Sequence, residues 1–201
     1  MSTWDKRLDF DEWRKKLEKE LKELRKEKEY WQMKAKPMPQ KYGRQLAYNS
    51  ILLTQLLNGS RISEAVEACI TFLKTEDREQ KINTRKRKKR SKNKETGEIK
   101  TMGHDTKVVI IIPNTIKKHY LEYIKNKTIE EITDAVILFA INHHKINTHS
   151  LRYAWIAKMG ELGKPANLIS KAIRHTNIQT IEKYTREAQA DDMKRDFVKC
   201  I

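Results

Sequence analysis

The chain has 201 residues, with 43 Lys or Arg against 27 Asp or Glu, so its formal net charge is +16 at pH 7. No apolar run approaches the roughly 18 to 20 residues of a membrane-spanning helix, and the charged start lacks the apolar segment of a secretory signal. We therefore expect a soluble protein of the reducing cytoplasm. Its two cysteines are too few for a disulfide framework or a zinc cluster, and Cys69 is expected to be a small core residue.

Residues 1–36 are predicted to form a charged, coiled-coil-like helix. Its apolar side chains recur every seven residues, at Phe10, Leu17, Leu24 and Trp31. This spacing places them on one narrow stripe, so we expect either a weak coiled coil or a helix that packs on another element. Prolines at 37 and 39 end the helix, and residues 37–40 are predicted to be a linker.

Residues 41–201 are predicted to form one mainly α-helical domain with a small antiparallel β-sheet, an α+β fold. The expected strands are 69–74, 80–85 and 107–112, where apolar or β-branched residues cluster. The expected helices are 48–57, 60–68, 114–126, 129–142, 150–161, 165–173 and a tail helix from 180 onward.

The positive charge is concentrated between the last two predicted strands. Residues 85–94 contain eight cations in ten positions and no acidic residue. Such a run repels itself unless it is solvated or faces a polyanion, so it favours binding to nucleic acid. The candidate contacts are Arg85, Arg87, Lys88, Lys89 and Arg90.

Three further segments carry side chains that can bind or attack a phosphate. Arg61 precedes a predicted helix, where a guanidinium and backbone amides can converge on an anion. His149 and Arg152 are three residues apart and so lie on one side of a helix. His175 precedes Tyr184 by nine residues. Each pattern alone is common in residues that serve only packing or ion pairing.

Taken in order, these segments resemble the tyrosine recombinase (phage-type integrase) family. The first arginine box of the family is similar to residues 59–64, its H-x-x-R box to residues 148–153, and its closing histidine-to-tyrosine box to residues 175–185. The resemblance covers residues 42–185 and, within the family, is greatest to integrases of archaeal viruses and plasmids. One departure is the pair Ile173-Arg174, where the family usually has Leu-Gly before the last histidine.

The resemblance implies a function and a set of catalytic residues. The protein would cut and rejoin double-stranded DNA at an attachment site through a 3′-phosphotyrosine on Tyr184, and so integrate a mobile or viral element. Arg61 and Arg152 would grip the phosphate, His149 would assist proton transfer, and His175 would donate to the phosphate. No metal or other cofactor is implied, and the enzyme would work as a homo-oligomer, a tetramer, on DNA in the cytoplasm of a host cell.

The family also uses a hairpin lysine as proton donor to the leaving oxygen. Counting from the inward residue Ile82 along an alternating strand favours Lys86. Lys88 has the same parity, and Lys100 is the alternative if the basic run is an insertion. All three remain open at this point.

Two other functions fit the same residues: a nicking and rejoining enzyme like type IB topoisomerases, and a DNA-binding relative without catalysis. Residues 1–40 are too short for the helical core-binding domain of full-length relatives, so we expect either a catalytic fragment or a short form. His104, His143 and His144 lack the spacing of a zinc site, and we expect them to contact solvent or phosphate.

Overall fold

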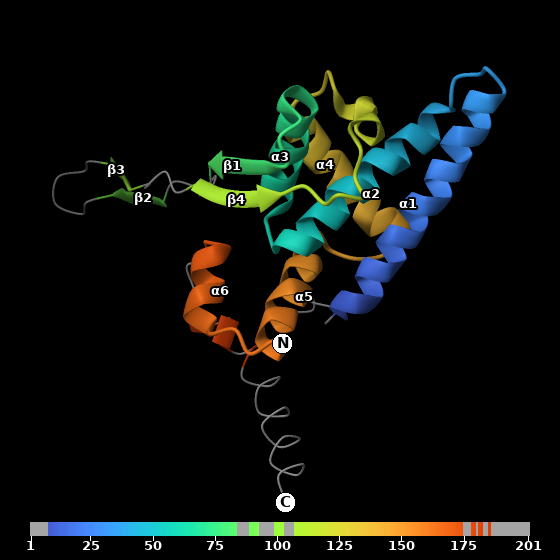
Figure 1. The fold of residues 1–201 in the computed structure, drawn as a ribbon. Coiled ribbons are helices and arrows are strands. Elements are labelled where there is room, and N and C mark those ends of the chain that lie inside the picture. Colours follow the sequence, from blue (N-terminus) through green and yellow to red (C-terminus); the bar gives the residue numbers. More distant parts are fainter. Residues whose placement is uncertain are drawn as a thin grey trace, which may run out of the picture.

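The computed structural model describes residues 8–83, 89–92, 99–102 and 107–174 together with 178, 179, 181, 182 and 185; of 89–92 and 99–102 it describes the backbone alone. These residues form six α-helices, two 3₁₀ turns, one π-helical turn and two pairs of antiparallel strands. Helices α2 to α5 occupy the middle of the molecule, with α1 on one side and the strands and α6 on the other (Figure 1). The expected mainly helical α+β fold is confirmed.

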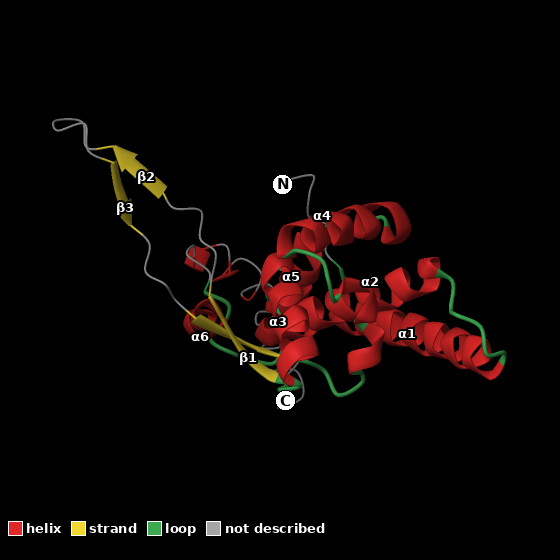
Figure 2. Ribbon diagram, turned by 90° about the horizontal axis from the view of Figure 1, so that it is seen from above, coloured by secondary structure: helices red, strands yellow, loops and turns green. Residues whose placement is uncertain are grey.

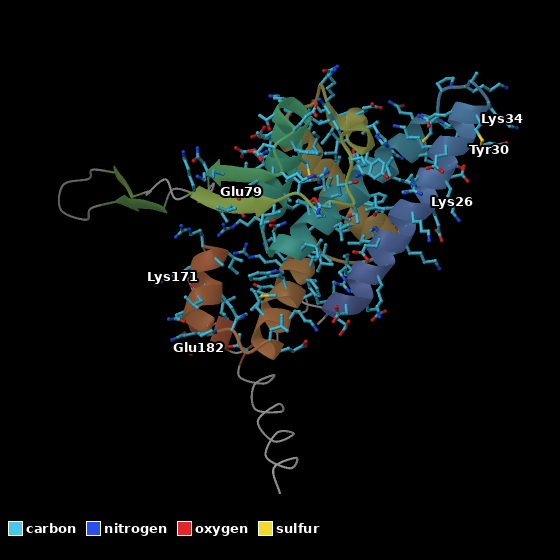
Figure 3. The ribbon with its side chains drawn as sticks, viewed as in Figure 1. Lys26, Tyr30, Lys34, Glu79, Lys171 and Glu182 are labelled. Carbon is cyan, nitrogen blue, oxygen red and sulfur yellow. The ribbon has the colours of Figure 1, made fainter. Side chains whose placement is uncertain are left out.

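Helix α1 (Phe10–Met33) packs along the helical body through its apolar stripe. The Asp9 carboxylate caps its start by accepting a hydrogen bond from the Glu12 amide at 2.7 Å. Trp13, Leu17 and Leu21 are buried in the same cluster as residues of α2. Chain segments on both sides of the proposed linker at 37–40 therefore share one core. At the other end of α1, Lys26, Tyr30 and Lys34 project away from the helical body (Figure 3).

Helices α2 (Gln40–Asn58) and α3 (Ile62–Thr75) form the centre of the core. Every residue of α2 from Leu46 to Leu56 is buried. The expected strand at 69–74 is wrong, because α3 continues to Thr75 and buries Ala65, Cys69 and Phe72 at helical spacing. Cys69 is a core residue as expected, and burial raises the pKa of its thiol to about 12.

The strands form two nested antiparallel pairs. β1 (Glu79–Asn83) pairs with β4 (Lys107–Ile111), and β2 (Lys89–Lys92) pairs with β3 (Ile99–Met102). In the inner pair, Ile82 lies opposite Val108 and both are buried, whereas Val109 and Ile111 face solvent. We call the β2–β3 pair the arm, since it extends away from the helical body in both views (Figures 1 and 2).

Two 3₁₀ turns, η1 (Lys118–Tyr120) and η2 (Glu122–Ile124), stand where a continuous helix was expected at 114–126. The cause is Arg78. Its guanidinium donates to the carbonyls of Ile112, Pro113 and Ile116 at 3.3, 2.7 and 3.2 Å. These carbonyls are thereby turned toward β1, and the segment follows the core in short turns.

The remaining helices complete the body. Thr128 and Glu131 form a capping box that starts α4 (Ile129–Phe139), which runs into the π-helical turn η3 (Ala140–His144). α5 (Thr148–Glu161) and α6 (Ala166–Ala172) follow, and a second small core joins them through Ile156, Ile169, Ile173 and Ile181. None of the helices in the described residues is long and apolar enough to cross a bilayer.

Candidate active site

Arg61 lies in the short turn between α2 and α3, directly before the first residue of α3. Gly59 permits this turn, because its φ of +58° is in the left-handed region that glycine adopts readily. A β-carbon on Gly59 would lie 2.4 Å from Cε3 of Trp155 on α5. The absence of a side chain at position 59 therefore lets the arginine turn lie directly against α5.

Glu64 fixes the position of Arg61. Its Oε1 accepts a hydrogen bond from Arg61 Nη1 and its Oε2 accepts one from the Arg61 backbone amide, both at 2.8 Å. The Glu64 side chain is 2% exposed, whereas that of Arg61 is 30% exposed. A guanidinium has five N–H donors, so Arg61 is anchored at one edge and keeps donors for a second anion.

Arg152 is buried where three elements meet. Its Nη1 donates to the carbonyl of Gly59 at 2.8 Å, and its Nη2 donates to the carbonyl of Ile173 at 3.0 Å. Burial, followed by the nearby charge of Arg61, lowers the pKa of Arg152 to about 10. The guanidinium is therefore still charged at neutral pH, and it ties the end of α6 to the α2–α3 turn.

His149 lies one turn before Arg152 on the same side of α5. The Asn147 side chain caps this helix by accepting a hydrogen bond from the His149 amide at 2.9 Å. Burial, then the charges of Arg152 and Arg61, lowers the pKa of His149 below its usual value. The imidazole is therefore neutral at physiological pH and can accept a proton.

Two polar residues that the sequence analysis did not identify hold this site together. Gln55, buried in α2, donates from Nε2 to the carbonyls of Thr148 and Ser60 at 3.0 and 3.4 Å. It thereby joins the start of α5 to the arginine turn. The signal available in the sequence was an amide within a helix that is otherwise buried and largely apolar.

Asn58 joins the same turn to the sheet. Its Oδ1 accepts from the Ile111 amide at 2.8 Å, and its Nδ2 donates to the Ile111 carbonyl at 2.9 Å. Both backbone groups of a strand residue point to the same side, so Asn58 occupies the edge of β4 that faces away from β1. β4, the strand that follows the arm in the chain, is therefore hydrogen-bonded to Asn58, the residue directly before Gly59.

The other predicted site residues lie outside the described part of the structure. Lys86, His175 and Tyr184 are not described, nor are Arg85, Arg87 and Lys88. Lys89 and Arg90 fall on β2 and Lys100 on β3, where only the backbone is described. Residues 186–201, where the tail helix was expected, and His104 are also outside it.

Residues near the closing box nevertheless pack on α5 and α6. Ile181 is fully buried with Ile156 and Ile173. Thr185 lies so close to Gly160 that a β-carbon on the glycine would be 2.9 Å from the Thr185 Cα. Arg174 has a φ of +52°, the left-handed conformation in which helices often end on glycine. The arginine therefore adopts the backbone conformation that glycine favours at this position.

The described part of the site can bind an anion. Arg61 and Arg152 have one neighbouring carboxylate among the described residues, that of Glu64, so the three side chains carry a net charge of +1. Buried charge without a counter-charge is unfavourable, which favours a ligand with negative charge such as a phosphodiester. The predicted residues Arg61, His149 and Arg152 are thus brought together, and the charges of both arginines contribute to the lowered pKa of His149.

Comparison with known proteins identifies a family and several relatives. The model of the phage integrase family matches residues 17–191. A protein named "Putative integrase ORF241" from Acidianus two-tailed virus is 33% identical over 195 residues, covering 96% of this chain and 68% of its own length. An uncharacterized protein of Methanocaldococcus jannaschii is 27% identical over 217 residues, covering 97% of this chain and 89% of its own length.

A third relative, "Putative integrase V10" of Sputnik virophage, is 27% identical over 161 residues, which are 75% of this chain and 71% of that protein. No solved structure gives a significant match.

Proposed function

Because the chain belongs to the phage integrase family, we propose that it cuts and rejoins double-stranded DNA through a covalent bond to Tyr184 and so integrates a mobile or viral element. The observation that carries this proposal is Arg152, a buried cation whose described partners are two backbone carbonyls, beside Arg61. Such a pair suits a phosphodiester, because displacement at phosphorus builds negative charge on the non-bridging oxygens. Planar guanidinium groups can bind two of those oxygens at once.

In the proposed reaction the phenol oxygen of Tyr184 attacks the scissile phosphorus and the bond to the 5′ oxygen breaks. The products are a 3′-phosphotyrosine and a DNA end with a free 5′ hydroxyl. A phenol has a pKa near 10, so it needs a base and a cationic site. His149, neutral at physiological pH, suits the transfer of the tyrosine proton. Rejoining is the reverse, with the 5′ hydroxyl attacking the phosphotyrosine.

Two further residues complete the proposal by resemblance to the family. Lys86 would give its proton to the leaving 5′ oxygen, with Lys88 and Lys100 as the alternatives, and His175 would donate a hydrogen bond to the phosphate. Arg174, the residue before His175, follows Ile173, whose carbonyl accepts from Arg152. The contact between Arg152 and Ile173, two residues before His175 in the sequence, supports this proposed role.

We also propose that the arm and its basic run bind the DNA backbone. A two-stranded β-ribbon is narrow enough for the major groove, which is about 12 Å wide. The candidate contacts are Arg85, Arg87, Lys88, Lys89 and Arg90. A homotetramer on two attachment sites, in the cytoplasm of the host cell, is the proposed working form.

The proposal is tested with a duplex that carries one nick or a bridging 5′ phosphorothiolate, incubated without metal in the presence of a chelator. We expect a covalent protein–DNA adduct on a denaturing gel with wild type and none with Tyr184→Phe. Tyr30→Phe is the matched control, because Tyr30 is exposed on the far side of α1 (Figure 3). An adduct that persists in Tyr184→Phe would overturn the proposal.

The same adduct would form in an enzyme that only nicks and rejoins one duplex. A second assay therefore offers two duplexes bearing attachment sites and measures exchange of strands between them. Exchange supports a recombinase. Relaxation of supercoiled plasmid without exchange would instead support the function of a type IB topoisomerase.

A further inference from the structure

Glu20 on α1 and the consecutive residues His143 and His144 of η3 form a cluster outside the arginine site. His143 Nε2 lies 3.6 Å from Glu20 Oε2, and His144 Nδ1 lies 3.7 Å from Glu20 Oε1. One ligand atom from each of the three side chains falls within 4.8 Å of the others. π-helical turns such as η3 are frequent at functional sites. We refer to these three residues as the Glu20–His143–His144 cluster.

His144 contributes a buried ring nitrogen that has no hydrogen-bond partner. Its side chain is 1% exposed, and its Nδ1 is unpaired among the described residues. The other ring nitrogen, Nε2, lies 2.8 Å from Oδ1 of Asn49, whose Nδ2 donates to Glu20 Oε2 at 3.1 Å. An amide oxygen only accepts, so His144 Nε2 carries the proton and Nδ1 presents a lone pair toward Glu20.

His144 Nδ1 and the Glu20 carboxylate are therefore two hydrogen-bond acceptors that face each other. The Nδ1 lone pair and the Glu20 carboxylate both require a donor or a cation between them. No donor among the described residues lies between them, and a cation bound by both atoms would satisfy them.

The distances suit a small transition-metal ion. Ligands about 2.0–2.1 Å from a tetrahedral zinc ion lie roughly 3.3 Å from one another. The two histidine nitrogens lie 3.6 and 3.7 Å from Glu20, each from a different oxygen of the carboxylate. The Asn49 amide fixes the His144 tautomer, as outer-shell carboxylates and carbonyls do at metal sites. His143 is stacked on Phe139, with ring centroids 4.8 Å apart. Two of the three ligands are thus already held in position.

The cluster opens on a groove of about 430 Å³ between α1 and α2. Glu23 and Glu27 add two more carboxylates to its lining, and His143 and Glu20 retain 43% and 23% of their side-chain exposure. A cation can enter from this side, and water can fill the remaining coordination position.

We propose that Glu20, His143 and His144 bind one zinc-class divalent ion, which fastens α1 to η3, the turn that follows α4. Both imidazoles and the carboxylate are ligands that zinc prefers, whereas magnesium and calcium favour oxygen alone. The expectation that these histidines merely contact solvent or phosphate is replaced by this proposal. It does not depend on the proposed recombinase function, because Glu20, His143 and His144 lie outside the site of Arg61 and Arg152.

The test uses tag-free protein treated with a chelator and then titrated with zinc chloride by calorimetry. We expect one equivalent to bind, and the affinity to fall at least tenfold in His143→Ala and in Glu20→Gln, each of which removes one ligand from a partly exposed position. His119→Ala is the matched control, because His119 is an exposed histidine on η1. It should bind zinc as wild type does.

Two readouts accompany the titration. Cobalt(II) should give the visible absorption of a tetrahedral site in wild type and lose it in His143→Ala. Zinc should raise the midpoint of thermal unfolding of wild type but not of Glu20→Gln, because a ligand that binds only the folded state stabilises it. Absence of binding to wild type, or unchanged affinity in both ligand variants, would overturn the proposal.

Discussion

The site of Arg61 and Arg152 and the Glu20–His143–His144 cluster differ in the kind of ligand that each can bind. In the described part of the chain, the first has excess positive charge, and the second has two facing acceptors without a donor. At the first, Arg61 pairs with the Glu64 carboxylate, whereas Arg152 donates to two backbone carbonyls. At the second, a carboxylate faces an imidazole lone pair that has no donor among the described residues. Buried polar groups are normally satisfied, so the kind of partner that is missing indicates the ligand. The first site calls for an anion and the second for a cation.

The largest effect should come from Arg152→Lys and should affect the first site alone. A lysine ammonium cannot bridge the Gly59 and Ile173 carbonyls and also bind phosphate oxygens in the plane of a guanidinium. We expect the rate of adduct formation to fall about 10² to 10³-fold, the usual loss when one donor to a transition state is removed. Zinc affinity should stay unchanged.

Arg25→Lys is the control for this experiment, because Arg25 is an exposed residue of α1 that pairs with Glu29. Cleavage by Arg152→Lys at the wild-type rate would contradict the role given to the buried guanidinium.

Gly59→Ala should destabilise the protein next most strongly. Alanine at φ +58° is strained, and its β-carbon would collide with Trp155. The two effects together should lower the free energy of unfolding by about 2–4 kcal/mol, measured by urea unfolding. Gly163→Ala isolates the first effect, because Gly163 has a φ of +69° with open space around it, and should lose about 1 kcal/mol. Equal losses would mean that Trp155 moves aside freely.

Gln55→Ala should weaken the connection between α5 and the arginine turn. It leaves the carbonyls of Thr148 and Ser60 without this buried donor, so we expect a loss of about 1–3 kcal/mol in the free energy of unfolding. Adduct formation should also slow, whereas the rate at Gln32→Ala, an exposed position on α1, should not change. A slow Gln55→Ala enzyme with normal zinc binding would show that the two sites are held by separate contacts.

Arg174→Gly should stabilise the protein. Glycine relieves the left-handed backbone at φ +52°, so we expect the free energy of unfolding to rise by about 1 kcal/mol. Arg174→Ala keeps the strain and serves as the control, with little gain expected. Equal gains from both substitutions would indicate that the arginine side chain, and not its backbone, is unfavourable.

The smallest effect concerns the pKa of His149. Burial, Arg152 and Arg61 all lower it, so removing the charge in Arg61→Gln should raise this pKa toward its ordinary value. In wild type, cleavage should fall only as the pH drops below 6.5 and protonates His149. NMR titration of the His149 ring gives the pKa directly, and an unchanged value in Arg61→Gln would show that the two groups do not interact.

The sequence predicted the elements with strong local signals. The seven-residue apolar repeat and the prolines located α1, and the β-branched run located β4. The segment 69–74 was mistaken for a strand because Ile70 and Thr71 favour strands, while the contacts of Cys69 and Phe72 with the core keep it in α3. The turns at 114–126 depend on Arg78, a residue distant in sequence whose contacts no local pattern shows.

The candidate site also contains residues that local motifs identify and residues that only the tertiary fold identifies. Arg61, His149 and Arg152 belong to short boxes that can be read locally, and the fold brings them together. The partners that hold them, Gln55 and Asn58, were missed because their value comes from carbonyls that the tertiary fold places beside them. The cluster was missed for the same reason, since Glu20 lies far from His143 and His144 in the chain and the spacing of the ligands exists only in three dimensions.

The two hydrogen bonds between Asn58 and Ile111 give the molecule a mechanical property. Asn58 is the last residue of the buried helix α2, and it holds β4, the strand that follows the arm in the chain. A force directed along β4 would pass through these two hydrogen bonds to Asn58. The residues that follow Asn58 directly in the chain are Gly59, Ser60 and Arg61. Under the proposed function, force that DNA applies to the arm would therefore reach Arg61, the residue proposed to bind the phosphate.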